Sequence, residues 1–372
     1  MLYRDHRDKT YSVIGYGCGC MLKNDLETNI ALVEYAYQQG INYFDTAPNY
    51  GNSEKVIAYA FDCQKNRPII ASKSKAKTES TIRIQCETSL KKMNLAFIDD
   101  YYMWCFYGYK DFLSRKDALK GLEKLKKDGL IKNICASIHA SVEDTKKILS
   151  EYPFDGVLLS HSILSNYRKE SIDYAVSRDC KVAIMNPLAG GIIPRFAEKF
   201  NYIRNDDETV VESALRYLID DNNITTVLVG IENKKDINEA LSAVTGYEPL
   251  SKAQKKNIQK TNIKDICTNC GYCKCPQNIP VLKLMDSYNY YYFWQREKRA
   301  VVRARVYWGI NLNEISCKEC GKCESLCPQK LPIRERIKQL KKFANRNIFI
   351  KLLILLYEGI KHKWVNYILK NT

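Results

Sequence analysis

The sequence predicts an α/β protein in which a closed (β/α)8 TIM barrel, residues 1–250, is followed by a small, mainly α-helical domain, residues 251–340. Residues 11–245 alternate short β-branched or aromatic runs with longer segments of helical periodicity, and eight such units can be counted. The composition changes near Pro249, and eight of the fifteen cysteines then fall into two short runs. Residues 341–372 are predicted to form a basic, amphipathic helical tail.

The predicted barrel strands are strongly apolar, which is typical of a parallel sheet buried on both faces. They are Ser12–Gly17, Asn42–Thr46, Pro68–Ser72, Ile98–Trp104, Lys132–Ile138, Asp155–His161, Lys181–Asn186 and Thr225–Gly230. The clearest helices between them carry apolar residues at three- and four-residue steps. These helices are Glu27–Gln39, Ser80–Met93, Lys116–Lys127 and Thr209–Asp220.

The two cysteine runs predict a pair of iron–sulfur clusters. The second run, Cys317-x2-Cys-x2-Cys-x3-Cys327-Pro, matches the bacterial pattern in which three thiolates hold one [4Fe-4S] cluster and the fourth holds the other. The first run, Cys267-x2-Cys-x2-Cys-x-Cys275-Pro, supplies the partner. One predicted ligand set is Cys267, Cys270, Cys273 and Cys327, and the other is Cys317, Cys320, Cys323 and Cys275. The small domain is therefore predicted to be ferredoxin-like.

Structural zinc and disulfides are the alternatives for these cysteines. Zinc favours two separated Cys-x2-Cys pairs per ion, whereas each run here packs three closely spaced cysteines and a Cys-Pro together. Disulfides need an oxidising compartment, and the charged N-terminus lacks the apolar segment of a signal peptide. We therefore expect a cytoplasmic protein. Cys275 is the least secure ligand, because one residue rather than three separates it from Cys273.

The positive charge is concentrated in the C-terminal part of the chain. Residues 251–372 contain 25 Lys and Arg against 8 Asp and Glu, a balance of +17, which leaves 33 against 34 for residues 1–250. Two clusters with four thiolates each would offset about four of these charges. The surplus predicts a partner such as an acidic electron carrier, a ferredoxin or a flavodoxin. An anionic membrane surface in contact with the basic tail is an alternative.

Tyrosine and arginine interleave between the cysteine runs, over Tyr288–Trp308. We expect a helical segment whose aromatic residues cover the clusters, with the arginines facing solvent. Interleaved aromatic and basic residues also bind single-stranded nucleic acid. Because no nucleic-acid-binding module can be identified, we do not expect a nucleic-acid partner.

Reacting groups of a barrel enzyme lie at the C-terminal ends of its strands. Strand two ends in Asp45-Thr-Ala-Pro-Asn-Tyr-Gly-Asn-Ser-Glu54, and strand three ends in Lys73. This pattern resembles the aldo/keto reductases. Met185-Asn-Pro-Leu-Ala-Gly-Gly191 and Val229-Gly-Ile-Glu-Asn233 are similar to that family's last two strand ends, and the two cysteine runs resemble a subgroup with a C-terminal ferredoxin-like domain.

The resemblance implies hydride transfer between a nicotinamide cofactor and a carbonyl at a tetrad of Asp, Tyr, Lys and His. Tyr50 would be the general acid, Lys73 would lower the pKa of that tyrosine, and Asp45 would pair with the lysine. Trp104 stands where the histidine belongs. An indole N–H can donate a hydrogen bond but cannot accept one, so Trp104 could at most hold a carbonyl oxygen. Neither His139 nor His161 is a convincing replacement.

The same resemblance implies a site for NADP(H). Ser137 fits the position that contacts the carboxamide, although Leu158 stands where a glutamine is usual and His161 where an aromatic residue stacks on nicotinamide. The backbone of Leu188 to Gly191 can cradle phosphate. The predicted cofactor-binding residues are Ser137, Leu188, Gly190, Gly230, Asn233 and Glu239.

Two functions are compatible with these residues. The first is an iron–sulfur oxidoreductase: the barrel binds NAD(P)H and a small carbonyl-like or unsaturated substrate, and two [4Fe-4S] clusters exchange electrons with a partner. The second is a non-catalytic electron-transfer or docking module with a degenerate reductase site, as Trp104 suggests. The retained Asp45, Tyr50 and Lys73 favour the enzyme, because a site without turnover has no physical need for them.

Overall fold

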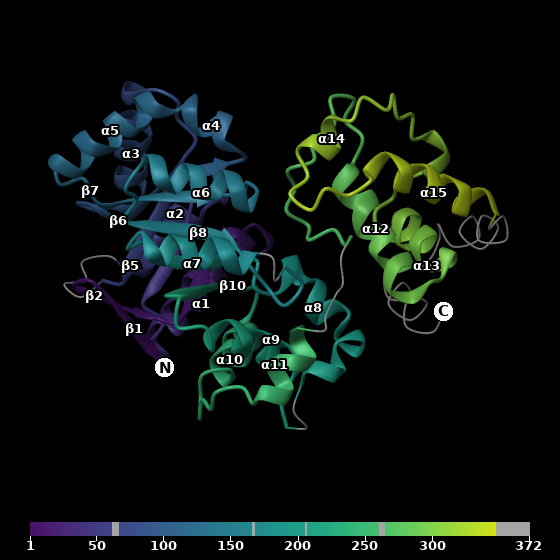
Figure 1. The fold of residues 1–372 in the computed structure, drawn as a ribbon, viewed down its shortest axis with the longest axis horizontal. Helices are drawn as coiled ribbons and strands as arrows, with labels where there is room; N and C mark the ends of the chain where they lie inside the picture. Colours follow the sequence, from purple (N-terminus) through teal and green to yellow (C-terminus); the bar gives the residue numbers. More distant parts are fainter. Residues whose placement is uncertain (62–66, 166–167, 205–206, 260–264, 347–372) are drawn as a thin grey trace. The chain divides into compact units, whose positions relative to one another are not determined.

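The computed structural model describes residues 1–61, 67–165, 168–204, 207–259 and 265–346. The chain divides into two compact units, residues 1–262 and 263–372 (Figure 1). Helix α11 (Lys252–Gln259) belongs to the first unit, so this unit extends past the predicted boundary at residue 250.

The first unit is a closed parallel barrel with the strand order β10-β3-β4-β5-β6-β7-β8-β9. The strands are β3 (Ile14–Gly17), β4 (Tyr43–Asp45), β5 (Ile69–Ser74), β6 (Ile98–Phe106), β7 (Ile131–Ile138), β8 (Gly156–Ser160), β9 (Lys181–Met185) and β10 (Thr226–Gly230). Each predicted barrel strand is present, and the predicted (β/α)8 barrel is confirmed.

Helices follow the barrel strands and cover the outside of the barrel (Figure 1). They are α1 (Leu26–Gln38), α2 (Ser53–Ala60), α3 (Glu79–Met93), α4 (Tyr109–Leu113), α5 (Lys116–Lys127), α6 (Val142–Glu151), α7 (Lys169–Ser177), α8 (Ile192–Arg195), α9 (Val210–Ile219) and α10 (Lys234–Ser242). Helix α5 illustrates the pattern: Leu119, Leu122 and Leu125 are buried, while its lysines face solvent.

A two-stranded antiparallel hairpin, β1 (Tyr3–His6) and β2 (Lys9–Ser12), precedes the barrel. The sequence analysis did not predict it, because both strands are short and mostly polar, with one tyrosine in each. Tyr11 nevertheless belongs to the cluster that fills the barrel, and its ring lies 5.8 Å from that of Tyr43. The hairpin therefore contributes a side chain to the barrel interior.

Side chains from seven of the barrel strands, β4 to β10, and from β2 fill the middle of the barrel. This cluster consists of Tyr11, Tyr43, Ile69, Ala71, Tyr102, Cys135, Leu158, Ala183 and Leu228. Because side chains alternate along a strand, the residues two positions later point the same way, one layer nearer the C-terminal end. Those positions include Asp45, Lys73, Trp104 and Ser137, which places the predicted site residues at one end of the barrel.

Strand β6 is irregular at this end. Its pairing with β7 shifts between Met103 and Phe106, where Trp104 and Cys105 together oppose Ser137. Cys105 has a φ of 61°, a left-handed conformation that is uncommon for a residue with a side chain. The strand was predicted to end at Trp104, but this bulge carries it on to Phe106 and changes the direction of the side chains there.

The second unit contains four α-helices within its described residues: α12 (Val281–Trp294), α13 (Glu297–Val302), α14 (Lys322–Ser325) and α15 (Ile333–Arg346). A short π-helical turn, Arg303–Tyr307, follows α13, so the segment between the cysteine runs is helical as predicted. The prediction that its arginines face solvent is wrong for Arg299 and Arg303, which are buried, and Arg303 pairs with Asp286. Leu284, Met285, Ile337 and Leu340 are buried where α12 packs on α15.

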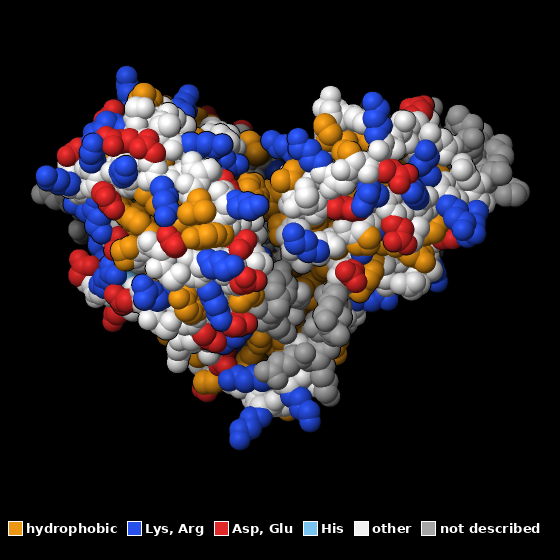
Figure 2. Space-filling model, turned by 45° about the horizontal axis from the view of Figure 1, so that its top comes forward, with side chains coloured by type: hydrophobic (Ala, Val, Ile, Leu, Met, Phe, Trp, Pro, Cys, Tyr) orange, Lys and Arg blue, Asp and Glu red, His pale blue; other side chains and the backbone are white. Residues whose placement is uncertain are grey.

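The predicted tail, residues 341–372, begins within α15, and residues 347–372 lie outside the described part of the chain. None of the helices described is long and apolar enough to cross a membrane. Lys and Arg side chains are spread over the visible surface together with acidic ones (Figure 2).

Candidate functional site

A buried ion pair lies at the C-terminal end of strands β4 and β5. The ammonium group of Lys73 donates to both carboxylate oxygens of Asp45, at 2.5 and 2.6 Å, and to the carbonyl oxygen of Thr46 at 2.9 Å. Both side chains are almost fully buried. Burial raises the pKa of Asp45, and the Lys73 charge opposes that shift. Sequence reasoning predicted this pair correctly.

Tyr50, from the loop after β4, and Trp104, from β6, lie beside this ion pair. The Lys73 ammonium is 5.2 Å from the centre of the Tyr50 ring, and the Trp104 ring meets the Tyr50 ring edge-on with the centres 5.7 Å apart. The structure therefore brings the four predicted catalytic residues together. The Lys75 ammonium lies 4.4 Å above the Trp104 ring.

The expected lowering of the tyrosine pKa by Lys73 is wrong for this structure. Burial raises the pKa of Tyr50 well above the usual value, and the Asp45 charge raises it further. The physical reason is that Lys73 directs its hydrogen bonds to Asp45 and Thr46, and Asp45 balances its charge. Tyr50 therefore stays protonated at neutral pH, which is the form a proton donor requires.

A second buried ion pair shows that such a pair is not sufficient for function. Lys181 pairs with Asp100 deeper in the barrel, where Tyr43 donates to Asp100 at 2.9 Å. The ring hydroxyls of Tyr43 and Tyr102 are also 2.9 Å apart. Each of these residues is buried, so this group lines the barrel interior. Only Asp45 and Lys73 lie beside a partly exposed tyrosine at the C-terminal end of the strands.

His139 enters the same region from the end of β7. Its Nε2 atom is 3.2 Å from the Ser137 hydroxyl and 3.5 Å from the Cys105 sulfur. Burial lowers the pKa of His139 to about 3, with smaller contributions from Arg168, Lys75 and Lys73, so the ring is neutral at pH 7. Cys105 was not among the predicted site residues, because strict strand alternation does not reveal a bulge.

His161 lies at the end of β8 and is also buried. Its Nδ1 atom is 3.2 Å from the carbonyl oxygen of Ser165, and its ring centre is 6.2 Å from that of Tyr217. Burial lowers its pKa to about 4. These contacts give His161 a structural role in packing the end of β8.

The remaining predicted cofactor residues follow β9 and β10. These two strands are paired in the barrel, so the segments after them begin side by side. After β9, Leu188 precedes Ala189, Gly190 and Gly191, whose φ values of 51°, 64° and 83° give the loop a left-handed course. Gly230 ends β10. Asn233 caps helix α10 by accepting a hydrogen bond from the backbone of Asp236, and Glu239 lies half-buried on that helix.

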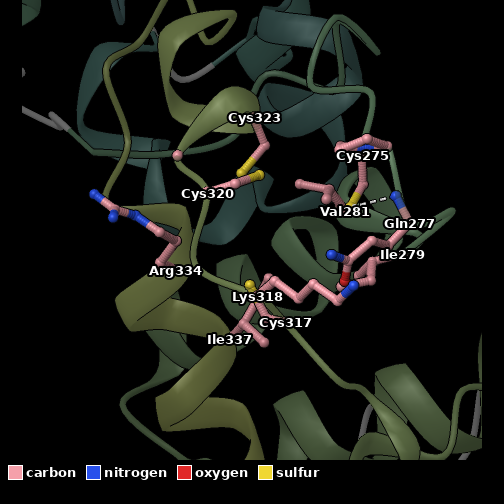
Figure 3. Close-up of a pocket in the computed structure, with 12 residues that line it drawn as sticks. Cys275, Gln277, Ile279, Val281, Cys317, Lys318, Cys320, Cys323, Arg334 and Ile337 are labelled. Carbon is pink, nitrogen blue, oxygen red and sulfur yellow. Dashed lines mark hydrogen bonds between the residues drawn. The ribbon is translucent and has the colours of Figure 1, made fainter.

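The eight cysteines of the second unit line two cavities. One cavity is bordered by Cys267, Cys270, Cys273 and Cys327. The other is bordered by Cys317, Cys320, Cys323 and Cys275, whose side chains surround a common hollow in Figure 3. These are the two sets given by the sequence pattern, including the exchange of the fourth cysteine between the runs.

The backbone conformation repeats between the two cysteine runs. Asn269 and Glu319, each two residues after the first cysteine of its run, have φ values of 53° and 55°. Gly271 and Gly321, two residues later, have φ values of 74° and 73°. This alternation of left-handed positions curls both loops in the same way around their cysteines.

The repeat continues through the fourth cysteine of each run. Cys275-Pro-Gln-Asn-Ile-Pro280 and Cys327-Pro-Gln-Lys-Leu-Pro332 are nearly identical, and each leads directly into a helix, α12 or α15. The backbone N–H three residues after the cysteine donates to the cysteine carbonyl at 3.1 Å in both copies. This repeat is visible in the sequence and identifies Cys275 as the counterpart of Cys327 despite its shortened spacing.

The two residues missing from the first run correspond to a helical turn. Cys323 lies within α14, which ends at Ser325, and three residues separate it from Cys327, whereas only Lys274 separates Cys273 from Cys275. Within the described part of the chain, no three Cys, His, Asp or Glu side chains converge closely enough to hold a single metal ion. A zinc ion would require four sulfurs at about 2.3 Å from one point.

Comparisons with known proteins agree with the barrel fold. The family model for the aldo/keto reductase family matches residues 14–263. The chain belongs to the aldo/keto reductase family. It is therefore an oxidoreductase of the NAD(P)H-linked type.

Among related proteins, L-galactose dehydrogenase of Arabidopsis thaliana is 25% identical over 264 residues, which cover 61% of this chain and 81% of that protein. An uncharacterised oxidoreductase of Bacillus subtilis is 20% identical over 290 residues, 67% of this chain and 93% of that protein. Among solved structures, the holo form of an aldo-keto reductase from Bacillus halodurans matches with a TM-score of 0.62 and 20% identity, covering 70% of this chain and 96% of that one. The family match ends before the first cysteine run, so it concerns the barrel unit.

Proposed function

We propose that this chain is an iron–sulfur oxidoreductase whose barrel binds NADP(H) and a small carbonyl-like or unsaturated substrate, and whose eight C-terminal cysteines hold two [4Fe-4S] clusters that exchange electrons with a partner. The observation that carries the proposal is the sorting of the cysteines into two four-cysteine cavities, each with three from one run and one from the other. This is the arrangement expected for paired clusters.

The cysteine loops fit such a group in three further respects. Four thiolates are available at each cavity and no single-ion site competes for them among the described residues. The backbone N–H of Gln277 donates to the Cys275 sulfur and that of Glu319 to the Cys317 sulfur, each at 3.4 Å. Hydrogen bonds to cluster sulfurs are one way in which a protein sets cluster potential. The cysteines would hold the clusters, which supply one-electron chemistry when bound.

The barrel supports the other half of the proposal. Ser137, Leu188, Gly190 and Gly230 lie at the C-terminal strand ends, where barrel enzymes bind their ligands. A related aldo-keto reductase from Klebsiella pneumoniae has been solved in complex with NADPH, with a TM-score of 0.59 and 17% identity. We assign Asn233 and Glu239 to the outer part of the cofactor site, because both belong to the helix that follows Gly230.

The protein groups have distinct roles in carbonyl reduction. A bound nicotinamide would supply hydride to a carbonyl carbon, and the Tyr50 hydroxyl would supply the proton that completes the alcohol. The Lys73 ammonium group, which is paired with Asp45, packs against the Tyr50 ring and so helps to position it. The Trp104 indole N–H can donate to the substrate oxygen but cannot relay a proton. Of these two side chains, Tyr50 is therefore the one that can supply the proton.

The electron count is consistent with two clusters rather than one. A nicotinamide moves two electrons as hydride, whereas each [4Fe-4S] cluster carries one electron at a time. Two clusters together store the two electrons of one hydride equivalent.

The alternative is a non-catalytic electron-transfer or docking module. The contact of Trp104 with Tyr50 favours it, since the indole edge occupies space beside the proton donor.

Anaerobic iron and sulfide analysis with EPR tests the cluster assignment. We expect about eight iron and eight sulfide per chain, with a signal that appears on reduction by dithionite. Two zinc without sulfide would exclude the clusters. Quenching of NADPH fluorescence tests the barrel separately, and no response at millimolar cofactor would favour the docking module.

A further inference from the structure

We propose that helix α15 and the loop carrying Cys317 form a docking surface for an acidic, one-electron carrier protein, and that the cysteine centre of Cys317, Cys320, Cys323 and Cys275 is the one that exchanges electrons with it. The inference rests on the clusters of the proposed function. It adds which centre faces the partner and which side chains recognise that partner.

The two cysteine centres differ in their access to solvent. Cys320 is exposed, and Cys317 and Cys275 are partly exposed, so three ligands of this centre reach the surface. In the other centre, Cys270 and Cys273 are partly exposed and Cys267 and Cys327 are buried, so Cys320 is the one fully exposed cysteine among the eight. Electron transfer to a protein partner requires close approach, so the exposed centre is the one available to it.

A basic groove adjoins this exposed centre. It is lined by Ile315, Cys317, Glu319, Arg334, Ile337, Lys338, Lys341, Lys342, Asn345 and Arg346. Cys317, Arg334 and Ile337 also line the cysteine cavity itself, so the groove and the centre share a wall. A partner seated in the groove would touch a ligand of the centre.

The groove keeps an excess of positive charge after its ion pairs are counted. Five of its lining residues are Lys or Arg and one is acidic. Arg334 and Arg346 pair with Glu324 and Glu297, which lie outside the lining, and Lys338 pairs with Glu319. Five cations then face three carboxylates. This excess gives attraction to an acidic surface, mainly through a faster encounter.

The side chains of the groove favour a protein over the other anionic partners. No aromatic side chain is among the described residues that line it, so it offers no platform on which nucleic-acid bases could stack. The apolar side chains of the lining, Ile315 and Ile337, are partly or fully buried and provide no exposed apolar face for insertion into a membrane. Small, polar contact surfaces are typical of transient electron-transfer complexes.

The test uses the full chain with its clusters in place and an acidic plant-type [2Fe-2S] ferredoxin as the probe. Stopped-flow absorbance measures the rate of electron exchange with the ferredoxin, and dithionite serves as a small reductant that needs no docking. The test variant is the double charge reversal Lys338→Glu with Lys342→Glu, both exposed on α15. The matched control is Lys120→Glu with Lys127→Glu, both exposed on α5 of the barrel unit.

We expect the α15 variant to lose at least about tenfold in the ferredoxin rate at low ionic strength, and this loss should shrink in high salt. The dithionite rate, the iron content and the control variant should match the wild type. Equal ferredoxin rates in both variants, with clusters present and reducible, would overturn the docking surface alone. So would tighter binding of the wild type to anionic vesicles or to an oligonucleotide than to ferredoxin. Absence of iron and sulfide would instead overturn the proposed function.

Discussion

Cys275 and Cys317 each accept a backbone hydrogen bond at 3.4 Å from the residue two positions further along the chain, although they come from different cysteine runs. Both sulfurs line the same cavity (Figure 3). Cys275 therefore lies where the predicted ligand set with Cys317, Cys320 and Cys323 requires it. This position also identifies the variant that tests the crossed ligand arrangement most directly.

Replacing Cys275 with serine should damage the second centre and spare the first. A serine hydroxyl is a far weaker iron ligand than a thiolate, so we expect iron and sulfide to fall from about eight to about four per chain. Cys20→Ser is the matched control, because Cys20 is a partly exposed thiol of the barrel unit without ligand spacing. Loss of both clusters to an equal extent would contradict the crossed assignment, provided the variant is folded by circular dichroism.

The barrel, and the sorting of the eight cysteines between two cavities, could be predicted from the sequence because both depend on local patterns. Buried parallel strands such as Ile131–Ile138 can be identified from their apolar composition alone. The spacing of the cysteines along the chain likewise indicates which of them can lie around one centre. The bulge at Trp104 and Cys105 could not be predicted, because it depends on how β6 pairs with β7. The proximity of His139 to Cys105 is a consequence of that bulge.

The direction of the Tyr50 pKa shift was wrong for a related reason. The sequence placed Lys73 near the tyrosine, but it could not show that Asp45 and Thr46 take the hydrogen bonds of the ammonium group. Burial then dominates over the attraction of a charge that is already paired. The sign of such a shift depends on contacts in three dimensions.

Replacing Tyr50 with phenylalanine should abolish most carbonyl reduction while preserving cofactor binding. Loss of a positioned general acid typically costs 10²–10⁴-fold, so we expect kcat to fall at least about 100-fold with an unchanged Kd for NADPH. Tyr59→Phe, on the exposed face of α2, is the control and should behave as the wild type. Retention of full kcat in Tyr50→Phe would show that another group donates the proton.

The raised pKa of Tyr50 predicts an unusual pH profile. Proton donation requires the neutral phenol, and burial with the nearby Asp45 keeps the pKa well above the ordinary value of about 10. Reduction should therefore keep a constant kcat from pH 7 to about 10 and decline only above it. A decline centred at pH 8 to 9 would mean that cofactor or substrate binding lowers the tyrosine pKa in the complex.

His161 should make the barrel unit sensitive to acid. Its pKa is lowered by burial to about 4 in the folded chain, against about 6.5 in an unfolded one. The unfolded state therefore binds the proton first, and the stability contributed by the neutral ring is lost as the pH falls from about 6.5 toward 4. The shift corresponds to about 3 kcal/mol at most. The stability difference between the wild type and His161→Gln should narrow over this range in urea unfolding, and a constant difference would contradict the shift.

Replacing Trp104 with histidine tests whether this residue redirected the site. The indole donates one hydrogen bond and cannot exchange a proton, whereas an imidazole can do both, and its smaller ring leaves more room beside Tyr50. We expect kcat/KM for simple aldehydes to rise at least about tenfold in Trp104→His, within the usual range for an added acid–base group. Trp104→Phe keeps an aromatic ring without a polar hydrogen and should give no such gain. If both variants gain equally, then space rather than proton exchange limits carbonyl reduction in this barrel.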